Sequence, residues 1–356
     1  MNSILQRKSN FELLRIICML LIIWGHLTNI YSVNEPILGL TYIETRLLKS
    51  FTIVAVNVFI LISGYFSISF KLPRILKIGQ LTWFYSVTLL IFTISYGWHS
   101  INYYDITCFM PILSKKYWFI TIYIILYILS PCLNKLALSI SKNNFKSVLI
   151  IGFFIIYIWH TLSFILNLSR PIDDAGYGIP NFIYLYLLGR YIKLHSNVYD
   201  IKQNFLLWYF VIGILLFIFQ LTYSIILGFS FTALFSYNTI FVFLGAVALF
   251  LFFTKLNIGY NIVINKWAKY CLAVYVIHTH ADFFTKLCDF LQITHIPPIW
   301  FIPYSLSISI IMYITFALVE KIRLYFFDRI ENKINCRIMQ TKIAQKIESK
   351  IKLINV

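Results

Sequence analysis

The sequence predicts an all-α protein, a polytopic transmembrane helical bundle of about ten spans with both termini in the cytoplasm. Of the 356 residues, 60% are hydrophobic and only 12% are charged, whereas about 25% of a soluble domain is charged. The apolar segments approach the roughly 20 residues that a spanning helix needs, and they lack the period-two alternation of a membrane barrel. Lys and Arg residues also cluster in alternate connecting segments, as the positive-inside rule requires.

Ten hydrophobic segments follow one another along the chain. They lie at about 11–31, 48–69, 76–96, 117–137, 147–168, 178–194, 205–228, 231–254, 268–290 and 299–320. With a cytoplasmic N-terminus, the inside segments hold 23 Lys and Arg residues and the outside segments hold six, while Arg15 lies within the first span. The first segment is long enough to span and no small-residue cleavage site follows it, so we expect no cleaved signal peptide.

Residues 323–356 form a predicted basic tail that follows a membrane-embedded domain of residues 1–322. Isoleucines recur in it every four or five residues among Lys, Arg and Glu, at positions 330, 334, 338, 343, 347 and 351. This pattern predicts an amphipathic cytoplasmic helix on the anionic inner leaflet, so that membrane lipids are its partners. A nucleic-acid-binding arm is the alternative interpretation, and we expect no nucleic-acid partner.

The six cysteines indicate neither a disulfide framework nor a metal site. They are scattered over positions 18, 108, 132, 271, 288 and 336, mostly within apolar segments, and no C-x-x-C pair occurs. Structural zinc sites need closely spaced Cys and His ligands. We therefore expect no bound metal.

The first span carries two ionisable residues, Arg15 and His26. They are eleven residues apart, which is three helical turns plus about 20°, so they share one helix face roughly 16 Å apart. An arginine at mid-membrane costs about 2.5–3.5 kcal/mol, so we expect an interaction that offsets this cost, and the shared face favours a functional role for the pair. The alternative is that Arg15 extends to the inner headgroups and His26 makes an interhelical hydrogen bond.

The second span contains a small notch formed by Ser63 and Gly64, which admits either another backbone or a thin ligand arm. The turn that follows places Lys71 and Arg74 at the cytoplasmic mouth of the bundle. These cations are either a positive-inside signal or a clamp for phosphate groups.

Histidines also occur in the fifth and ninth spans. The ninth contains Y-V-I-H-T-H-A-D, with His278 and His280 two residues apart and therefore on different sides of a helix. His160 lies near the same outer side in the fifth span. Intramembrane ionisable residues are functional candidates, although a structural hydrogen bond is the more economical role for His160 and His280.

Several of these residues fall into an ordered set that resembles acyltransferase family 3, which includes bacterial O-acetyltransferases of surface polysaccharides. Arg15 and His26 resemble the family's R-x10-H motif, and residues 59–65, F-I-L-I-S-G-Y, resemble its F-F-x-x-S-G-[FY]. Trp118, Tyr127 and Pro131 match its W-x8-Y-x3-P pattern, and residues 275–278 resemble its Y-L-I-H motif. Two departures are Tyr123, where an acid is frequent, and Asn57, where many members have aspartate.

The resemblance implies an O-acyltransferase of the bacterial cytoplasmic membrane. It implies acyl-coenzyme A, most simply acetyl-CoA, as co-substrate without a tightly bound cofactor, and a surface polysaccharide or lipid-linked glycan as acceptor. His26 would then be the general base, acting directly or through an acyl-histidine, with Arg15 and His278 as further catalytic residues. The expected donor-binding residues are Arg15, Ser63, Gly64, Lys71 and Arg74, and the expected acceptor-binding residues are Asn57, Trp118, Tyr123 and His160.

Two other functions fit the same composition. A glycan flippase or transporter would line a translocation path with the same charges, but it predicts internal repeats and paired broken helices, which the sequence does not display. A glycan polymerase would be expected to have a large outside loop, and the longest outside segments here have about 15–20 residues. The sequence gives no oligomeric state.

Overall fold

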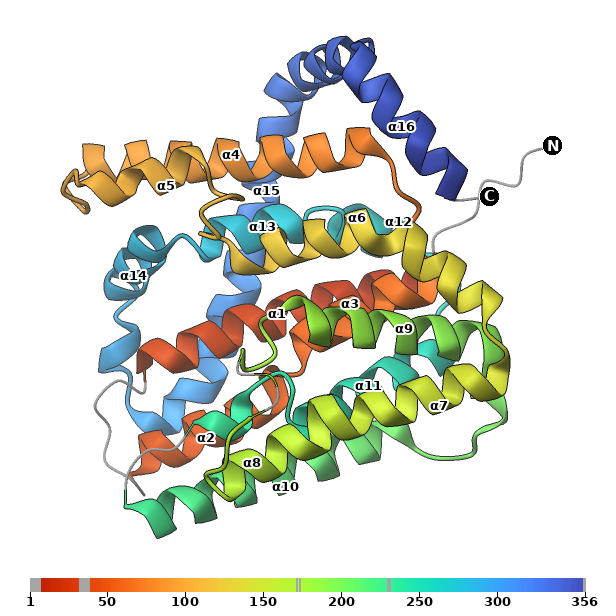
Figure 1. The fold of residues 1–356 in the computed structure, drawn as a ribbon. Coiled ribbons are helices and arrows are strands. Elements are labelled where there is room, and N and C mark those ends of the chain that lie inside the picture. The colour runs from red at the N-terminus through yellow and green to blue at the C-terminus, as the bar shows by residue number, and fades with distance from the viewer. Residues whose placement is uncertain (1–7, 32–38, 171, 173, 229–231, 355–356) are drawn as a thin grey trace.

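The computed structural model describes residues 8–31, 39–170, 172, 174–228 and 232–354. These ranges contain helices and no strand (Figure 1). The α-helices are α1 (Ser9–Tyr31), α2 (Leu40–Thr52), α3 (Ala55–Phe66), α4 (Leu72–Ser95), α5 (Ile106–Phe109), α6 (Trp118–Ser139), α7 (Lys142–Phe153), α8 (His160–Ile165), α9 (Ile179–His195), α10 (Phe205–Leu227), α11 (Ile240–Lys255), α12 (Ile262–Ala268), α13 (Cys271–His278), α14 (Ala281–Phe290), α15 (Pro298–Met339) and α16 (Lys342–Ile354). The predicted all-α helical bundle is confirmed.

Eight helical segments of the described chain are long and apolar enough to cross a membrane. The two other predicted spans differ from a regular spanning helix. The segment predicted at 178–194 is α9, which has 17 residues and is at the short end of spanning lengths. The segment predicted at 268–290 is broken, because α13 ends at His278 and α14 begins at Ala281.

The second span begins eight residues earlier than predicted. It consists of α2 and α3, joined through a short turn, and covers Leu40–Phe66. Arg46 and Lys49, two of the six Lys and Arg residues assigned to outside segments, therefore lie on a helix. The prediction of this boundary was wrong because the buried face of α2 carries hydroxyl groups, including those of Thr45 and Ser50, and a hydropathy pattern does not register such a face.

Helix α1 lies at the centre of the bundle and contacts α2, α3, α12, α13 and α15 (Figure 1). Beside it, α3 packs closely on α9. A Cβ atom on Gly64 of α3 would lie 2.1 Å from the Tyr186 carbonyl oxygen, and one on Gly189 of α9 would lie 2.5 Å from the Leu61 carbonyl oxygen. Glycine at both positions permits this backbone approach, which holds α3 against α9.

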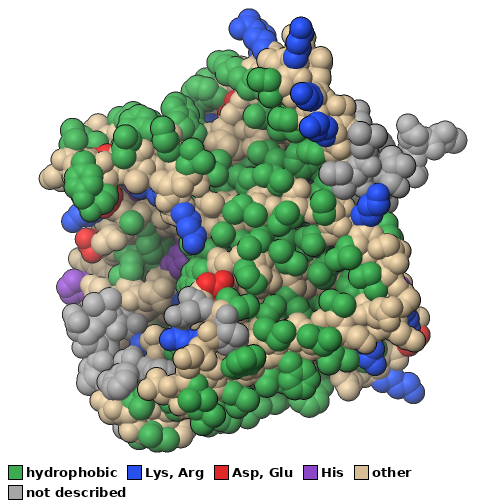
Figure 2. Space-filling model, in the orientation of Figure 1, with side chains coloured by type: hydrophobic (Ala, Val, Ile, Leu, Met, Phe, Trp, Pro, Cys, Tyr) green, Lys and Arg blue, Asp and Glu red, His purple; other side chains and the backbone are tan. Residues whose placement is uncertain are grey.

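The ends of the bundle differ from its long faces. Lys and Arg side chains gather toward the ends, while the visible long faces are mostly hydrophobic (Figure 2). Helix α1 begins and α16 ends at the same end of the bundle (Figure 1). Helix α15 continues through the predicted domain border at residues 322 and 323, and α16 then contacts α6.

Candidate active site

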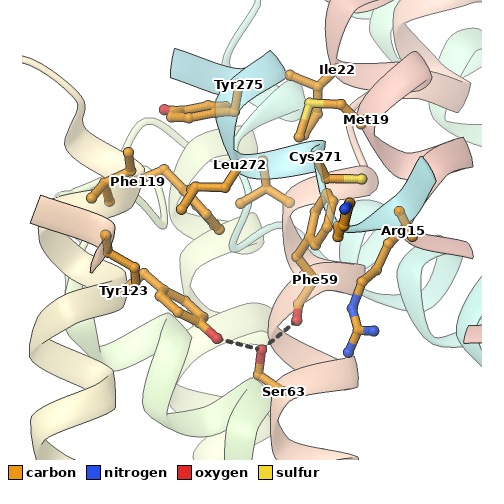
Figure 3. Close-up of a pocket in the computed structure, with 15 residues that line it drawn as sticks. Arg15, Met19, Ile22, Phe59, Ser63, Phe119, Tyr123, Cys271, Leu272 and Tyr275 are labelled. Atoms are coloured by element: carbon orange, nitrogen blue, oxygen red, sulfur yellow. Dashed lines mark hydrogen bonds between the residues drawn. The ribbon is translucent and has the colours of Figure 1, made fainter. Parts of the chain in front are cut away.

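An inner cavity of about 290 Å³ opens among α1, α3, α4, α6 and α13 (Figure 3). Its lining is mostly apolar, and Arg15 and Lys269 are its charged residues. Ser63 and Tyr123 also face it (Figure 3). The Ser63 hydroxyl donates to the Phe59 carbonyl at 2.9 Å, so the Tyr123 hydroxyl, 3.3 Å from Ser63 Oγ, is the donor between the two hydroxyls.

Arg15 is held by an acid of its own helix. Its Nη1 donates to Oε1 of Glu12 at 2.5 Å, and the side chains are 29% and 9% exposed respectively. The carboxylate offsets the cost of placing the guanidinium in the bundle. A guanidinium has five N–H donors, and Glu12 is the one hydrogen-bond acceptor for Arg15 among the described residues, so donors remain for a ligand in the cavity.

An outer cavity of about 380 Å³ lies further along α1 and is bounded by α6, α13 and α14. His26 and Asn29 of α1 line it together with Lys116, Trp118 and His278. Two more aromatic residues on its wall, Tyr237 and Phe284, come from distant parts of the chain.

The imidazole rings of His26 and His278 lie against each other, with their centroids 5.1 Å apart. Nδ1 of His278 is 2.7 Å from the Val274 carbonyl oxygen. A carbonyl oxygen only accepts, so Nδ1 carries the proton and Nε2 is an acceptor. Within the described residues, Nε2 of His278 has no hydrogen-bond partner. The ring of His26 likewise makes none with them, so its nitrogen atoms are available to a substrate.

The two cavities adjoin each other and share part of their lining. Ile22, Val56 and Tyr275 line both of them. Arg15 therefore faces the inner cavity and His26 the outer cavity from one continuous helix, at the roughly 16 Å that their spacing gives.

Three of the predicted donor-binding residues do not line the inner cavity. The backbone of α9 fills the space beside Gly64. Of the two interpretations of the Ser63–Gly64 notch, Gly64 therefore fits helix packing. Lys71 and Arg74 are exposed at the start of α4. The Lys71 N–H donates to the Tyr127 hydroxyl at 3.0 Å, and that hydroxyl donates to the Ser69 carbonyl, so Tyr127 fixes the turn that carries these cations.

Asn57 is fully buried in a polar network instead of facing a cavity. Its Nδ2 donates to the Tyr237 carbonyl at 2.8 Å, and its Oδ1 accepts from Asn181 Nδ2 at 3.3 Å. Asn181 in turn accepts from the Tyr157 hydroxyl at 2.6 Å. Asn57 thus supports Tyr237, which lines the outer cavity, and the structure gives it no surface for a substrate.

The two other histidines singled out in the sequence, His160 and His280, are fully buried outside both cavities. His160 lies in α8 against the Phe164 ring, at a centroid distance of 4.7 Å, and does not approach His26. His280 lies in the break between α13 and α14. Of the predicted acceptor-binding residues, Trp118 lines the outer cavity and Tyr123 the inner one.

Three site residues were missed in the sequence. Glu12 had a signal, since it precedes Arg15 by three residues and so lies on the same helix face. Lys116 and Lys269 had none, because only the fold brings the start of α6 and the end of α12 to α1.

A family model described as an acyltransferase domain, that of acyltransferase family 3, matches residues 8–285. The chain belongs to acyltransferase family 3. Every residue that lines the inner or the outer cavity falls within the matched region, whereas α15 and α16 follow it. The protein is therefore a multi-pass membrane acyltransferase. No curated protein and no solved structure matches this family member.

Proposed function

We propose that this acyltransferase moves an acyl group, most simply acetyl, from acyl-CoA to a hydroxyl of a surface polysaccharide or lipid-linked glycan in the bacterial cytoplasmic membrane. The observation that carries the proposal is the placement of Arg15 and His26 on one helix, facing two cavities that share a wall. An acyl group must pass between a donor and an acceptor, and this arrangement gives each its own compartment.

The inner cavity supports the donor part of the proposal. Arg15 and Lys269 supply positive charge for the phosphate groups of acyl-CoA. The apolar lining beyond them suits the uncharged pantetheine arm, and Ser63 and Tyr123 offer hydroxyl groups to its amides. A path of roughly 16 Å along α1, the spacing of Arg15 and His26, then brings the thioester past the shared wall to His26. Lys71 and Arg74 do not line this cavity, so in this proposal they contact the donor only at the cytoplasmic entrance, if at all.

His26 is the proposed general base. It removes the proton from an acceptor hydroxyl, whose oxygen attacks the thioester carbonyl carbon; the carbon–sulfur bond then breaks and the leaving thiolate takes the proton. An imidazole suits this transfer because its ordinary pKa is near neutrality. His278 packs against His26 with its Nε2 unpaired and is proposed to orient the base or the attacking hydroxyl. Acylation of His26 itself is the competing route.

The test uses the purified protein in lipid vesicles with radiolabelled acetyl-CoA and the glycan of its own cell surface. His26→Ala is expected to lower transfer by about 10²- to 10⁴-fold while leaving the thermal unfolding midpoint unchanged. His295→Ala is the matched control, because His295 is exposed and lines neither cavity. Undiminished transfer by His26→Ala would exclude His26 as the base, and absence of acetyl-CoA binding by the wild type would exclude the donor.

A further inference from the structure

The outer cavity has an unbalanced positive charge. Among the residues that line it, Lys116 is the one with a full charge, and no carboxylate joins it. Lys116 makes no hydrogen bond or ion pair within the described part of the chain. Two acids near the outer cavity, Asp105 and Asp282, contact His99 instead. Oδ1 of Asp105 lies 2.8 Å from Nε2 of His99, and Oδ2 of Asp282 lies 3.4 Å from its Nδ1. Lys116 acts on the Asp105 carboxylate through space but makes no ion pair with it, so its ammonium group is left for a ligand.

A second cation adds to the positive field near His26. Lys49 of α2 donates to Oδ1 of Asn29 at 3.2 Å, and Asn29 lines the outer cavity. A Cβ atom on Gly25 would lie 3.9 Å from Lys49 Nζ, which places that ammonium against α1 one residue before His26. A cavity with cations on its rim and no acid in its lining concentrates anions.

An aromatic surface stands beside Lys116. The ring of Trp118 packs edge-on to Tyr177 at a centroid distance of 4.5 Å and lies 5.7 Å from the ring of Tyr237. Trp118 and Tyr237 both line the cavity. Such rings present flat apolar faces, which fit the C–H face of a sugar ring, so a sugar held there would have its substituents within the reach of Lys116.

We propose that the acceptor is an acidic glycan, with a carboxylate or phosphate group bound by Lys116 and its sugar ring packed on Trp118. This inference rests on the proposed acyl transfer, since it names the class of acceptor for the same cavity. A lysine ammonium is a compact charge that pairs with either anion. The anionic group would fix the sugar so that one hydroxyl faces His26.

The test compares three forms of one oligosaccharide from an acidic bacterial polysaccharide: the uronic-acid form, its carboxyl-reduced neutral form and a phosphorylated neutral form. Binding is measured without donor, and transfer with acetyl-CoA, in phosphatidylcholine vesicles. Lys116→Ala should weaken binding of both anionic forms, and raise their KM, by roughly 10- to 100-fold, with the neutral form unaffected. Lys116→Arg should restore most of the affinity, and added salt should weaken wild-type binding.

Lys115→Ala is the matched control, because Lys115 is the adjacent cation, is exposed and lines neither cavity. Equal effects of Lys116→Ala on neutral and anionic forms, or an equal effect of Lys115→Ala, would overturn the acidic-acceptor proposal. An effect that appears only with phosphatidylglycerol in the vesicles would assign Lys116 to a lipid headgroup and overturn it as well. Charge-selective binding without any transfer would retain the anion site and refute acyl transfer.

Discussion

Replacing Gly64 by alanine is expected to force α3 away from α9 and to damage the site from a distance. The added Cβ would lie 2.1 Å from the Tyr186 carbonyl oxygen and 2.8 Å from its carbonyl carbon. Ordinary contact begins near 3.4 Å, so the helices must separate locally by about 1.3 Å (3.4 − 2.1). The obstacle is backbone on both sides, and no side-chain rotation relieves it.

The cost follows from the packing of the interior. Overpacking a well-packed core costs about 1–3 kcal/mol, and a clash between two backbones belongs at the upper end. A loss of about 3 kcal/mol corresponds to a fall in the unfolding midpoint on the order of 5 °C for a large domain. Ser63 precedes Gly64 and lines the inner cavity, so the displacement also widens that cavity and should raise the KM for acyl-CoA.

The assay is thermal unfolding of the detergent-solubilised protein, paired with donor titration in vesicles. Gly79→Ala is the matched control, since a Cβ there meets only the Ile112 side chain at 3.7 Å and lies within α4. Gly189→Ala should reproduce the effect of Gly64→Ala from the other helix. A midpoint for Gly64→Ala within 1 °C of that for Gly79→Ala would refute the close α3–α9 contact.

Three further perturbations test separate parts of the structure. Glu12→Gln should lower the unfolding midpoint because it leaves the Arg15 charge uncompensated. The double variant Glu12→Gln/Arg15→Gln should be more stable than the sum of the two single losses predicts. Simple additivity of the two losses would contradict an ion pair between Glu12 and Arg15. Asn57→Ala should lower the free energy of unfolding by about 1–3 kcal/mol, because it leaves buried polar groups unpaired, and should leave the KM for the acceptor unchanged. A raised KM in a variant of unchanged stability would contradict the supporting role of Asn57. Partial burial raises the pKa of Asp105. Hydrogen bonds from the Asn102 backbone N–H and from His99, with the charges of His99 and Lys116, outweigh that effect, so the net pKa is below its ordinary value. The ionised carboxylate therefore stabilises the loop at pH values above its ordinary pKa, about 3.9, and this stabilisation is lost as the pH falls through the lower pKa of the folded state. Hydrogen exchange of residues 97–116 should rise only below about pH 4 in the wild type, but should already be raised at pH 7 in Asp105→Asn. Equal exchange in both proteins at pH 7 would contradict this role of Asp105.

The sequence predicts spanning segments well where the buried and lipid-facing surfaces are both apolar, as in α1 and α10. It fails where tertiary packing decides the backbone. We predicted the ninth segment as one span, but α13 ends at His278 and the chain resumes at Ala281 without a glycine or proline to mark the break. The break is a product of the surrounding helices, and no local residue preference announces it.

The candidate site divides in the same way. Arg15 and His26 are predictable because they stand on one helix, where spacing alone gives a shared face and a distance. Residues whose role depends on a neighbouring helix are not. The sequence places Gly64 in a notch that could admit either another backbone or a ligand arm. Only the position of the α9 backbone shows that helix packing fills it. Asn57 is polar and intramembrane, yet its partners on α9 and before α11 already bond both its Nδ2 and its Oδ1.

The polar residues of the membrane segments thus fall into two groups: those whose hydrogen-bonding groups already have partners in the protein, and those whose groups do not. Asn57 has both a donor and an acceptor partner, and a buried polar group with partners contributes to the fold. His26, Lys116 and Nε2 of His278 have none within the described chain, although each lines the same cavity. Nε2 of His278 is buried, where an unpaired polar group is costly, and the partly exposed His26 and Lys116 line the same cavity. A substrate that completes the hydrogen bonds of all three best explains this arrangement.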